Sequence, residues 1–175
     1  MSRVVHWLLH RERLLFYAVN RKIKHSALDR LFSVITHAGG AAFTISASLL
    51  LAILGSGMWR IAGLECMIAL ALSHVPVAIV KRKYPRARPY LVLPDTNICK
   101  NPLTDHSFPS GHSTAVFSIA VPLVCAAPVL GYALLPLAGL VSLSRIYLGL
   151  HYPSDCAAGI AIGTCTGLGT VAIFA

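Results

Sequence analysis

Three short polar segments of this chain contain the residue types that phosphate chemistry needs. The first runs from Lys81 to Pro89 and places five Lys or Arg side chains within eight residues, directly after an apolar stretch. Clustered cations can bind an anion such as a phosphate group, whereas a basic segment that follows an apolar span is also typical of a membrane topology signal. Taken alone, this segment leaves both interpretations open.

The second segment is Pro109-Ser110-Gly111-His112, which stands where a polar stretch meets an apolar one. A Ser-Gly pair at a helix start offers backbone N–H groups and the positive end of the helix dipole to an anion. The following His112 is placed to exchange a proton with whatever binds there. A serine that only caps the helix, beside an interfacial histidine, is the alternative.

The third segment, Ser144 to Asp155, contains a cation, an imidazole and a carboxylate at the junction of two apolar stretches. Asp155 follows His151 by four residues and can accept the imidazole Nδ1–H. That bond would set the tautomer and leave Nε2 free to attack. Charged groups at the end of a membrane helix can also serve only as interfacial anchors.

The elements that must position these segments are membrane helices. The 175 residues are 56% hydrophobic and 12% charged, with a mean hydropathy of +0.70, which is more apolar surface than a soluble domain of this length can bury. We therefore predict an all-α, polytopic membrane bundle of about five spans, each close to the ~20 residues that cross a bilayer. The expected spans are Ser33 to Leu54, Ile61 to Val80, His112 to Val129, Gly131 to Leu148 and Ser154 to Ala175. Small residues recur in the last one and predict close helix packing.

The first thirty residues predict a different kind of element. Read as a helix, they carry apolar residues on one side and mostly basic or polar residues opposite, as in a helix that lies in the membrane interface. Glu12 falls within the apolar arc and interrupts this pattern. We expect residues 1–30 to form this interfacial segment and residues 31–175 to form one membrane-embedded domain.

Together the three polar segments resemble the type 2 phosphatidic acid phosphatase family, whose signature is K-x6-R-P, then P-S-G-H, then S-R-x5-H-x3-D. The matching positions are Lys81, Arg88 and Pro89; Pro109, Ser110, Gly111 and His112; and Ser144, Arg145, His151 and Asp155. They occur in the family's order and with its internal spacings.

The resemblance implies a function and a role for each matched residue. The chain would be a metal-independent phosphatase, without a cofactor, that acts on a membrane lipid such as phosphatidic acid, phosphatidylglycerophosphate or a polyprenyl diphosphate. His151 would be the nucleophile that forms a phosphohistidine, His112 the acid that protonates the leaving group, and Asp155 the residue that orients His151. The phosphoryl oxygens would be bound by Lys81, Arg88, Ser110, the Gly111 backbone and Arg145.

Two other functions would use some of the same residues. Vanadate-dependent haloperoxidases have similar anion-binding residues, but they are soluble and much larger. A non-catalytic membrane protein that binds anionic lipid headgroups would need the cations, but it has no use for two positioned imidazoles and a carboxylate.

The net charge of +9 suits nucleic acid, an anionic membrane or a phosphorylated substrate, and the placement of the cations beside apolar spans favours membrane lipids and a lipid phosphate over nucleic acid. By the positive-inside rule we expect a multi-pass protein of the cell membrane with its active site on the cytoplasmic face. The loop from Tyr90 to Phe108 is either a lid or a passive connector. The oligomeric state stays open.

Overall fold

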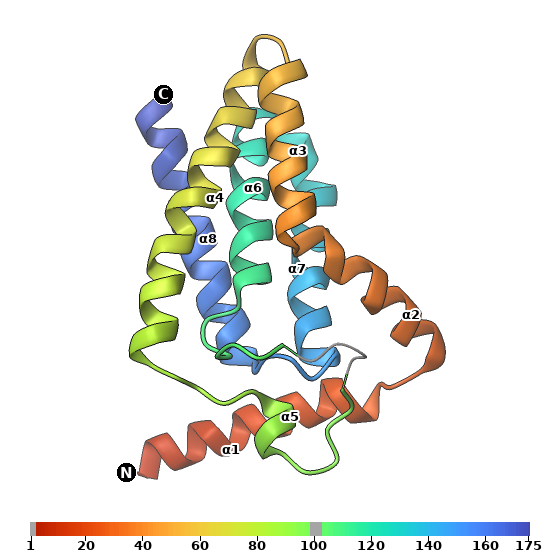
Figure 1. Ribbon diagram of the computed structural model, residues 1–175. Coiled ribbons are helices and arrows are strands. Elements are labelled where there is room, and N and C mark those ends of the chain that lie inside the picture. Colours follow the sequence, from red (N-terminus) through yellow and green to blue (C-terminus); the bar gives the residue numbers. More distant parts are fainter. Residues whose placement is uncertain (1–2, 99–102) are drawn as a thin grey trace.

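The chain forms an upright bundle of helices with one long helix lying across its lower end (Figure 1). This computed structural model describes residues 3–98 and 103–175, and that part of the chain contains helices and no strand. The bundle consists of α3 (Ala41–Leu54), α4 (Met58–Lys83), α6 (Gly111–Ala126), α7 (Gly131–Tyr147) and α8 (Pro153–Phe174). The crossing element is α1 (Arg3–Tyr17), which continues into a π-helical turn, η1 (Ala18–Lys22). The predicted all-α fold is confirmed.

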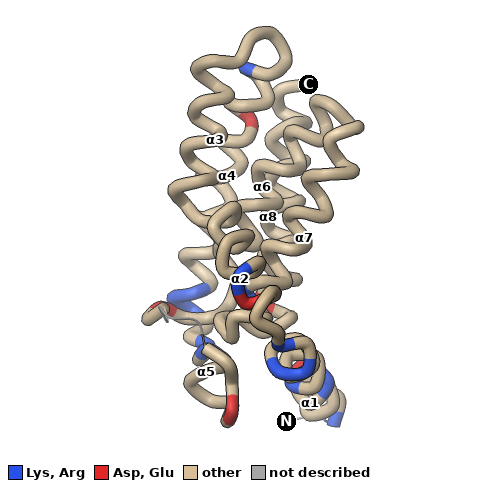
Figure 2. The backbone as a smooth tube through the Cα atoms, turned by 90° about the vertical axis from the view of Figure 1, so that its right-hand side faces the viewer, with Lys and Arg blue, Asp and Glu red and all other residues tan. Residues whose placement is uncertain are grey.

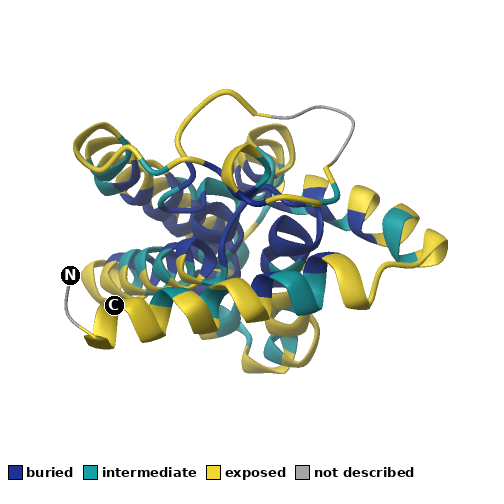
Figure 3. Cartoon of the chain, turned by 90° about the horizontal axis from the view of Figure 1, so that it is seen from below, coloured by how far each residue is buried: buried dark blue, intermediate teal, exposed yellow. Residues whose placement is uncertain are grey.

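Helix α6 lies at the centre of the bundle, where it packs against α4, α7 and α8. The buried residues gather along this axis, as the view from below in Figure 3 shows. Helix α8 approaches α6 so closely that a Cβ on Gly159 would lie 2.5 Å from the carbonyl oxygen of Ser110, and one on Gly163 would lie 2.4 Å from that of Thr114. The packing through small residues that we predicted for the last span is therefore confirmed.

The stretch predicted as one span from Ser33 to Leu54 is bent. Helix α2 (Ser26–Ile35) and the 3-10 turn η2 (Thr36–Gly39) meet α3 at an angle of 50°. The break falls at Gly40, whose backbone is extended, and a Cβ on Gly39 would lie 2.9 Å from the carbonyl oxygen of His112. The bend therefore packs η2 directly against the start of α6.

Within the described residues, three helices are long and apolar enough to cross a membrane: α4, α8, and α7 together with the 3-10 turn before it, η3 (Pro128–Leu130). The bent pair makes a fourth candidate, and α6 is apolar but has only 16 residues. The total of five spans stays a prediction. Helix α4 continues past the predicted end of its span, Val80, to Lys83. Lys81 therefore lies in a helical turn, where a cation also stabilises the carboxyl end of the helix.

Candidate active site

The three polar segments meet at the lower end of the bundle, between the helices and α1 (Figure 1). Lys81 comes from the last turn of α4, and Arg88 precedes the short helix α5 (Pro89–Val92). Gly111 and His112 open α6, Arg145 lies in the last turn of α7, and Asp155 lies in the first turn of α8. Segments that are far apart in the sequence therefore contribute to one site.

The turn between α7 and α8 brings His151 back to Arg145. Gly149 has a φ of +75°, and a Cβ there would lie 2.5 Å from the carbonyl oxygen of Asn97, so this position requires glycine on both counts. Behind this turn, the backbone N–H groups of Leu150 and His151 donate to the carbonyl oxygen of Arg145 at 3.0 and 3.2 Å. The spacing of the third motif thus corresponds to one compact turn.

His151 is buried between a cation and a carboxylate. Its Nε2 lies 3.2 Å from Nη1 of Arg88. Because a guanidinium can only donate, Nε2 must accept this bond, and the ring proton therefore sits on Nδ1. Nδ1 lies 3.5 Å from Oδ2 of Asp155, so the N–H side of the ring is next to that carboxylate. Burial, together with the positive charges of Arg145 and Arg88, lowers the pKa of His151 to about 4, which leaves the ring neutral at neutral pH.

The Asp155 carboxylate is fully buried and held from several sides. Its Oδ2 accepts the N–H of Tyr152 at 2.8 Å and the hydroxyl of Ser107 at 2.5 Å, and its Oδ1 accepts Nη1 of Arg86 at 2.7 Å. The bond from Tyr152, the N-cap residue of α8, ties this carboxylate to the start of that helix. Asp155 therefore has one orientation, and that orientation faces His151.

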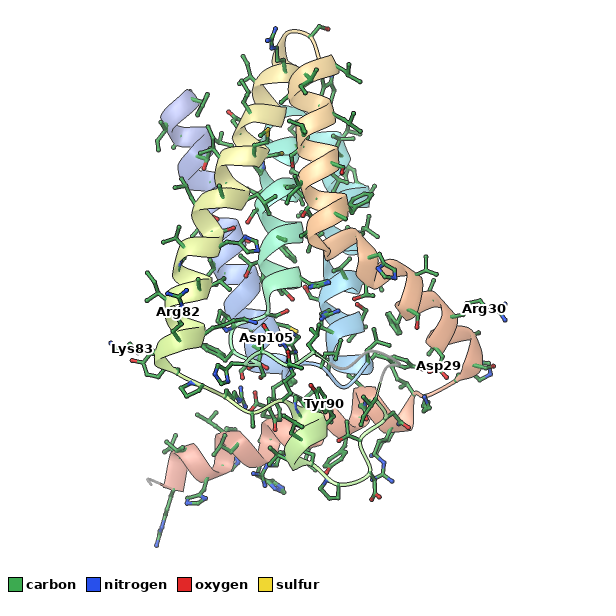
Figure 4. All side chains as sticks on the ribbon, in the orientation of Figure 1. Asp29, Arg30, Arg82, Lys83, Tyr90 and Asp105 are labelled. Carbon is green, nitrogen blue, oxygen red and sulfur yellow. The ribbon has the colours of Figure 1, made fainter. Side chains whose placement is uncertain are left out.

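The two cations of the first motif share a carboxylate partner, Asp105. Nη2 of Arg88 donates to Oδ1 of Asp105 at 2.6 Å, and Nζ of Lys81 donates to Oδ2. Burial alone would raise the pKa of Asp105, but Lys81 and Arg88 lower it to about 2. Figure 4 shows Asp105 at the lower end of the bundle, among the loops below the helices. A phosphoryl group that uses these N–H donors must compete with Asp105.

The second motif begins α6 with a capped turn. The buried Ser110 side chain accepts the N–H of Ser113 at 3.4 Å and its hydroxyl at 3.1 Å, which is the capping contact that the sequence left as an alternative. A phosphate contact from Ser110 stays a prediction. Gly111 borders open space, since a Cβ there would meet nothing within 4 Å. The first turn of α6 is thus accessible at Gly111.

Next to this turn is a cavity of about 480 Å³. His112 and Arg145 line it together with His37 from η2 and Leu148 from the turn after α7. Nη1 of Arg145 donates to the hydroxyl of Thr36 at 2.8 Å, so the bend between α2 and α3 supplies part of this wall. The cavity offers a cation, imidazoles and an apolar surface to one ligand.

A family model described as the PAP2 superfamily matches residues 62–175, well over half of the chain. The chain belongs to the PAP2 superfamily. The matched region holds all three motifs, and the resemblance to the type 2 phosphatidic acid phosphatases is confirmed.

Relatives of this PAP2 chain include lipid phosphatases. An undecaprenyl-diphosphatase of Sulfolobus acidocaldarius is 33% identical over 103 residues, which cover 58% of this chain and 50% of that protein. A lipid A 1-phosphatase of Rhizobium etli is 28% identical over 182 residues, which cover 93% of this chain and 78% of that protein. The chain spans about half the length of several of the curated relatives that it matches.

The crystal structure of Aquifex aeolicus LpxE has a fold similar to that of the PAP2 chain. The TM-score is 0.82 at 28% identity, and the match covers 90% of this chain and 93% of that one. With its apolar helices and these relatives, this chain is a membrane protein.

Four residues at the PAP2 site were not singled out from the sequence: Glu12, Arg86, Asp105 and Ser107. Glu12 did leave a signal, because it interrupts the apolar arc of the first helix, and in the structure it faces the bundle and pairs with Arg86. Asp105 belongs to the loop that we expected to be a lid or a connector. Residues 99–102 of that loop, which include Lys100 and Asn101, lie outside the described part of the chain.

Proposed function

We propose that this chain is an integral-membrane, metal-independent phosphatase that hydrolyses a phosphate or diphosphate ester of a membrane lipid through a phosphohistidine. The observation that carries the proposal is the environment of His151. His151 is a buried imidazole whose Nε2 accepts from Arg88 and whose N–H side is next to Asp155, so it becomes an oriented nucleophile when Arg88 donates to the phosphoryl oxygens instead. A protein that only binds anionic lipid has no use for this arrangement.

The reaction has two steps. In the first, Nε2 of His151 attacks phosphorus, the bond from phosphorus to the lipid oxygen breaks, and the leaving oxygen takes a proton from His112. In the second, His112 accepts a proton from a water that attacks the phosphohistidine, the P–N bond breaks, and inorganic phosphate leaves. Phosphoryl transfer depends mainly on positioning and on positive charge around the equatorial oxygens. Lys81, Arg88 and Arg145 supply that charge, and the Gly111 backbone and Ser110 complete the binding set.

The cavity beside His112 gives the substrate a place. Arg145 and His112 line this cavity and could bind a phosphate, while Leu148 and Leu150 offer an apolar surface to the lipid. The relatives named above act on a polyprenyl diphosphate and on lipid A, which supports a lipid phosphate as the substrate class. Phosphate release from a panel of lipid phosphates in detergent tests the proposal directly.

We expect activity to survive excess chelator and to be blocked by vanadate. Three side-chain cations hold the position that a metal takes in other phosphatases, and they should bind a trigonal-bipyramidal mimic of the transition state more tightly than the substrate. Release of inorganic phosphate is measured in EDTA, and then with increasing vanadate. Activity that disappears in EDTA and returns with Mg²⁺ would show that the proposed site is misassigned.

We also propose that α1 lies in the membrane interface and that the site faces the cytoplasm. Large apolar side chains of α1, among them Val4, Trp7 and Leu15, are exposed, as an interfacial helix needs. Figure 2 shows Lys and Arg gathered at the end of the molecule that holds α1, α2 and α5. Arg60, near the start of α4, belongs to the opposite end. The positive-inside rule then favours a cytoplasmic location for the first of these ends.

Cysteine labelling in intact cells tests this orientation. In a variant without the five native cysteines, Arg82→Cys marks the site end of α4 and Ser56→Cys marks the loop before α4; both positions are exposed. With a membrane-impermeant maleimide, we expect Ser56→Cys to react in intact cells and Arg82→Cys only after permeabilisation. The reverse pattern would place the site outside the cell.

A further inference from the structure

Helix α1 is linked to the Asp155 carboxylate by two residues that the family signature does not specify: Glu12 on α1 and Arg86, which occupies an unspecified position of the first motif. Oε2 of Glu12 accepts Nη2 of Arg86 at 2.6 Å, and Nη1 of the same guanidinium donates to Oδ1 of Asp155 at 2.7 Å. Oδ2 of Asp155 is the atom that faces Nδ1 of His151. One guanidinium therefore joins a carboxylate on α1 to the carboxylate beside the nucleophile.

The three charged side chains of this arrangement are largely shielded from solvent. Asp155 is fully buried, the side chain of Glu12 is 12% exposed and that of Arg86 is 27% exposed. A buried carboxylate that loses its cation is strongly destabilised, because neither water nor a second charge compensates it. Arg86 supplies this positive charge to Asp155, while Arg88 and Lys81 pair with Asp105 instead.

The position of Arg86 is held from three sides. Its guanidinium lies 3.9 Å from the ring centre of Tyr152, and its Nη1 also donates to the hydroxyl of Ser154 at 2.8 Å. Oε1 of Glu12 accepts the N–H of Ser154 at 3.2 Å and its hydroxyl, which ties α1 to the first turn of α8. A guanidinium fork suits such a bridge because its donors are fixed in one plane.

Helix α1 is itself docked on the bundle next to these contacts. Phe16 is fully buried and packs against Tyr152, with ring centres 5.9 Å apart. Further along, the buried Asn20 side chain donates to the carbonyl oxygens of Asn97 and Tyr147 at 2.9 and 2.8 Å. The position of Glu12 is therefore coupled to the packing of the whole helix.

We propose that Glu12 and Arg86 are positioning residues for the phosphatase reaction: α1 holds Arg86 through Glu12, and Arg86 orients and compensates Asp155, which in turn orients His151. This inference rests on the proposed function, because it acts through the assigned nucleophile. A misplacement of about 1 Å in such a chain can cost about 10²-fold in rate. Substrate binding should change little, since the phosphate-binding cations are other residues.

The test measures two quantities on the full chain in detergent: the single-turnover rate constant for phosphorylation of His151, and the affinity for vanadate. We expect Arg86→Gln to lower the rate constant about 100-fold and Glu12→Gln about tenfold, with vanadate affinity within about twofold of the parent. Arg86→Lys keeps the charge but cannot bridge both carboxylates, so its rate constant should fall between those of the parent and Arg86→Gln. Arg11→Gln on α1 and Arg82→Gln at the end of α4 are matched controls that remove an exposed cation and should match the parent.

A double-mutant comparison separates positioning from general structural support. If Glu12 and Arg86 act through Asp155, then Glu12→Gln and Arg86→Gln should have almost no further effect on the rate constant in an Asp155→Asn background. The proposal would be overturned if Glu12→Gln and Arg86→Gln lowered the rate constant in the Asp155→Asn background as much as in the parent. It would also be overturned if Arg86→Gln kept the parental rate constant. Loss of vanadate affinity in both Arg86→Gln and Arg86→Lys would also overturn it, because the contacts would then support the fold of the site. A parent chain that forms no phosphohistidine would refute the proposed function itself, whereas the three outcomes above refute only the positioning role of Glu12 and Arg86.

Discussion

His151→Ala is expected to abolish turnover, with a loss of roughly 10⁴-fold or more, because it removes the nucleophile. Incubation of the parent chain with a ³²P-labelled lipid phosphate followed by rapid acid-free quenching should trap a covalent label, and the variant should incorporate none. The expectation follows from the geometry of one ring, whose Nε2 lone pair is turned toward Arg88 and whose N–H is next to Asp155. Within the described residues, His151 is the only buried histidine.

His10→Ala on the exposed side of α1 is the control for the loss of a histidine, and it should retain parental turnover. Vanadate affinity of His151→Ala shows whether the binding cations are still in place. Full activity in a folded His151→Ala variant would refute the assignment of the nucleophile.

The second large effect is expected for His112→Ala. This variant lacks the acid that protonates the leaving oxygen, so turnover of a lipid phosphate should fall about 10²- to 10⁴-fold. An ester with a good leaving group, such as an aryl phosphate, needs little protonation and should be affected much less. The comparison of the two substrates therefore tests whether His112 acts as the acid, and not only whether the enzyme needs it.

His112→Ala and His151→Ala should also differ in whether a phosphohistidine accumulates. The nucleophile is intact in His112→Ala, and His112 also assists the attack of water in the second step, so aryl phosphate should leave a measurable phosphohistidine. An equal loss on aryl and lipid substrates would contradict an acid role and would favour a role in binding. Rate constants for formation and decay of the label, taken from quenched time courses, distinguish an acid role of His112 from a role in binding.

Much of this fold could be predicted from the sequence because it depends on local patterns. Apolar runs of span length correspond to α4, α7 and α8, and the recurring small residues of the last span do pack against α6. The bend at Gly40 was missed, since an apolar run does not show where a helix must turn aside to meet another. That turn is made by contact between η2 and the start of α6, which are more than seventy residues apart.

The motif residues show the same difference between what local spacing predicts and what the tertiary structure adds. Asp155 lies in the first turn of α8 and His151 lies two residues before that helix, so the four-residue spacing alone keeps the two side chains close. The placement of His112 in the first turn of a helix also follows from the sequence. The convergence of the three segments was inferred from the order of spans, and in the structure they do meet at one end of the bundle. The roles of the individual side chains stay predictions until the variants are measured.

By itself, then, the sequence determined the helical membrane architecture and the motifs, because hydropathy and short-range spacing act within one element. Tertiary structure alone decided which charges neutralise one another: Asp105 pairs with Lys81 and Arg88, and Glu12 pairs with Arg86. Several cations of the segment from Lys81 to Arg88 were equivalent in the sequence, and the packing of α1 and the loop before α6 distinguished them. The physical reason is that an ion pair in a buried site depends on distances of a few ångströms between elements, which no spacing along the chain specifies.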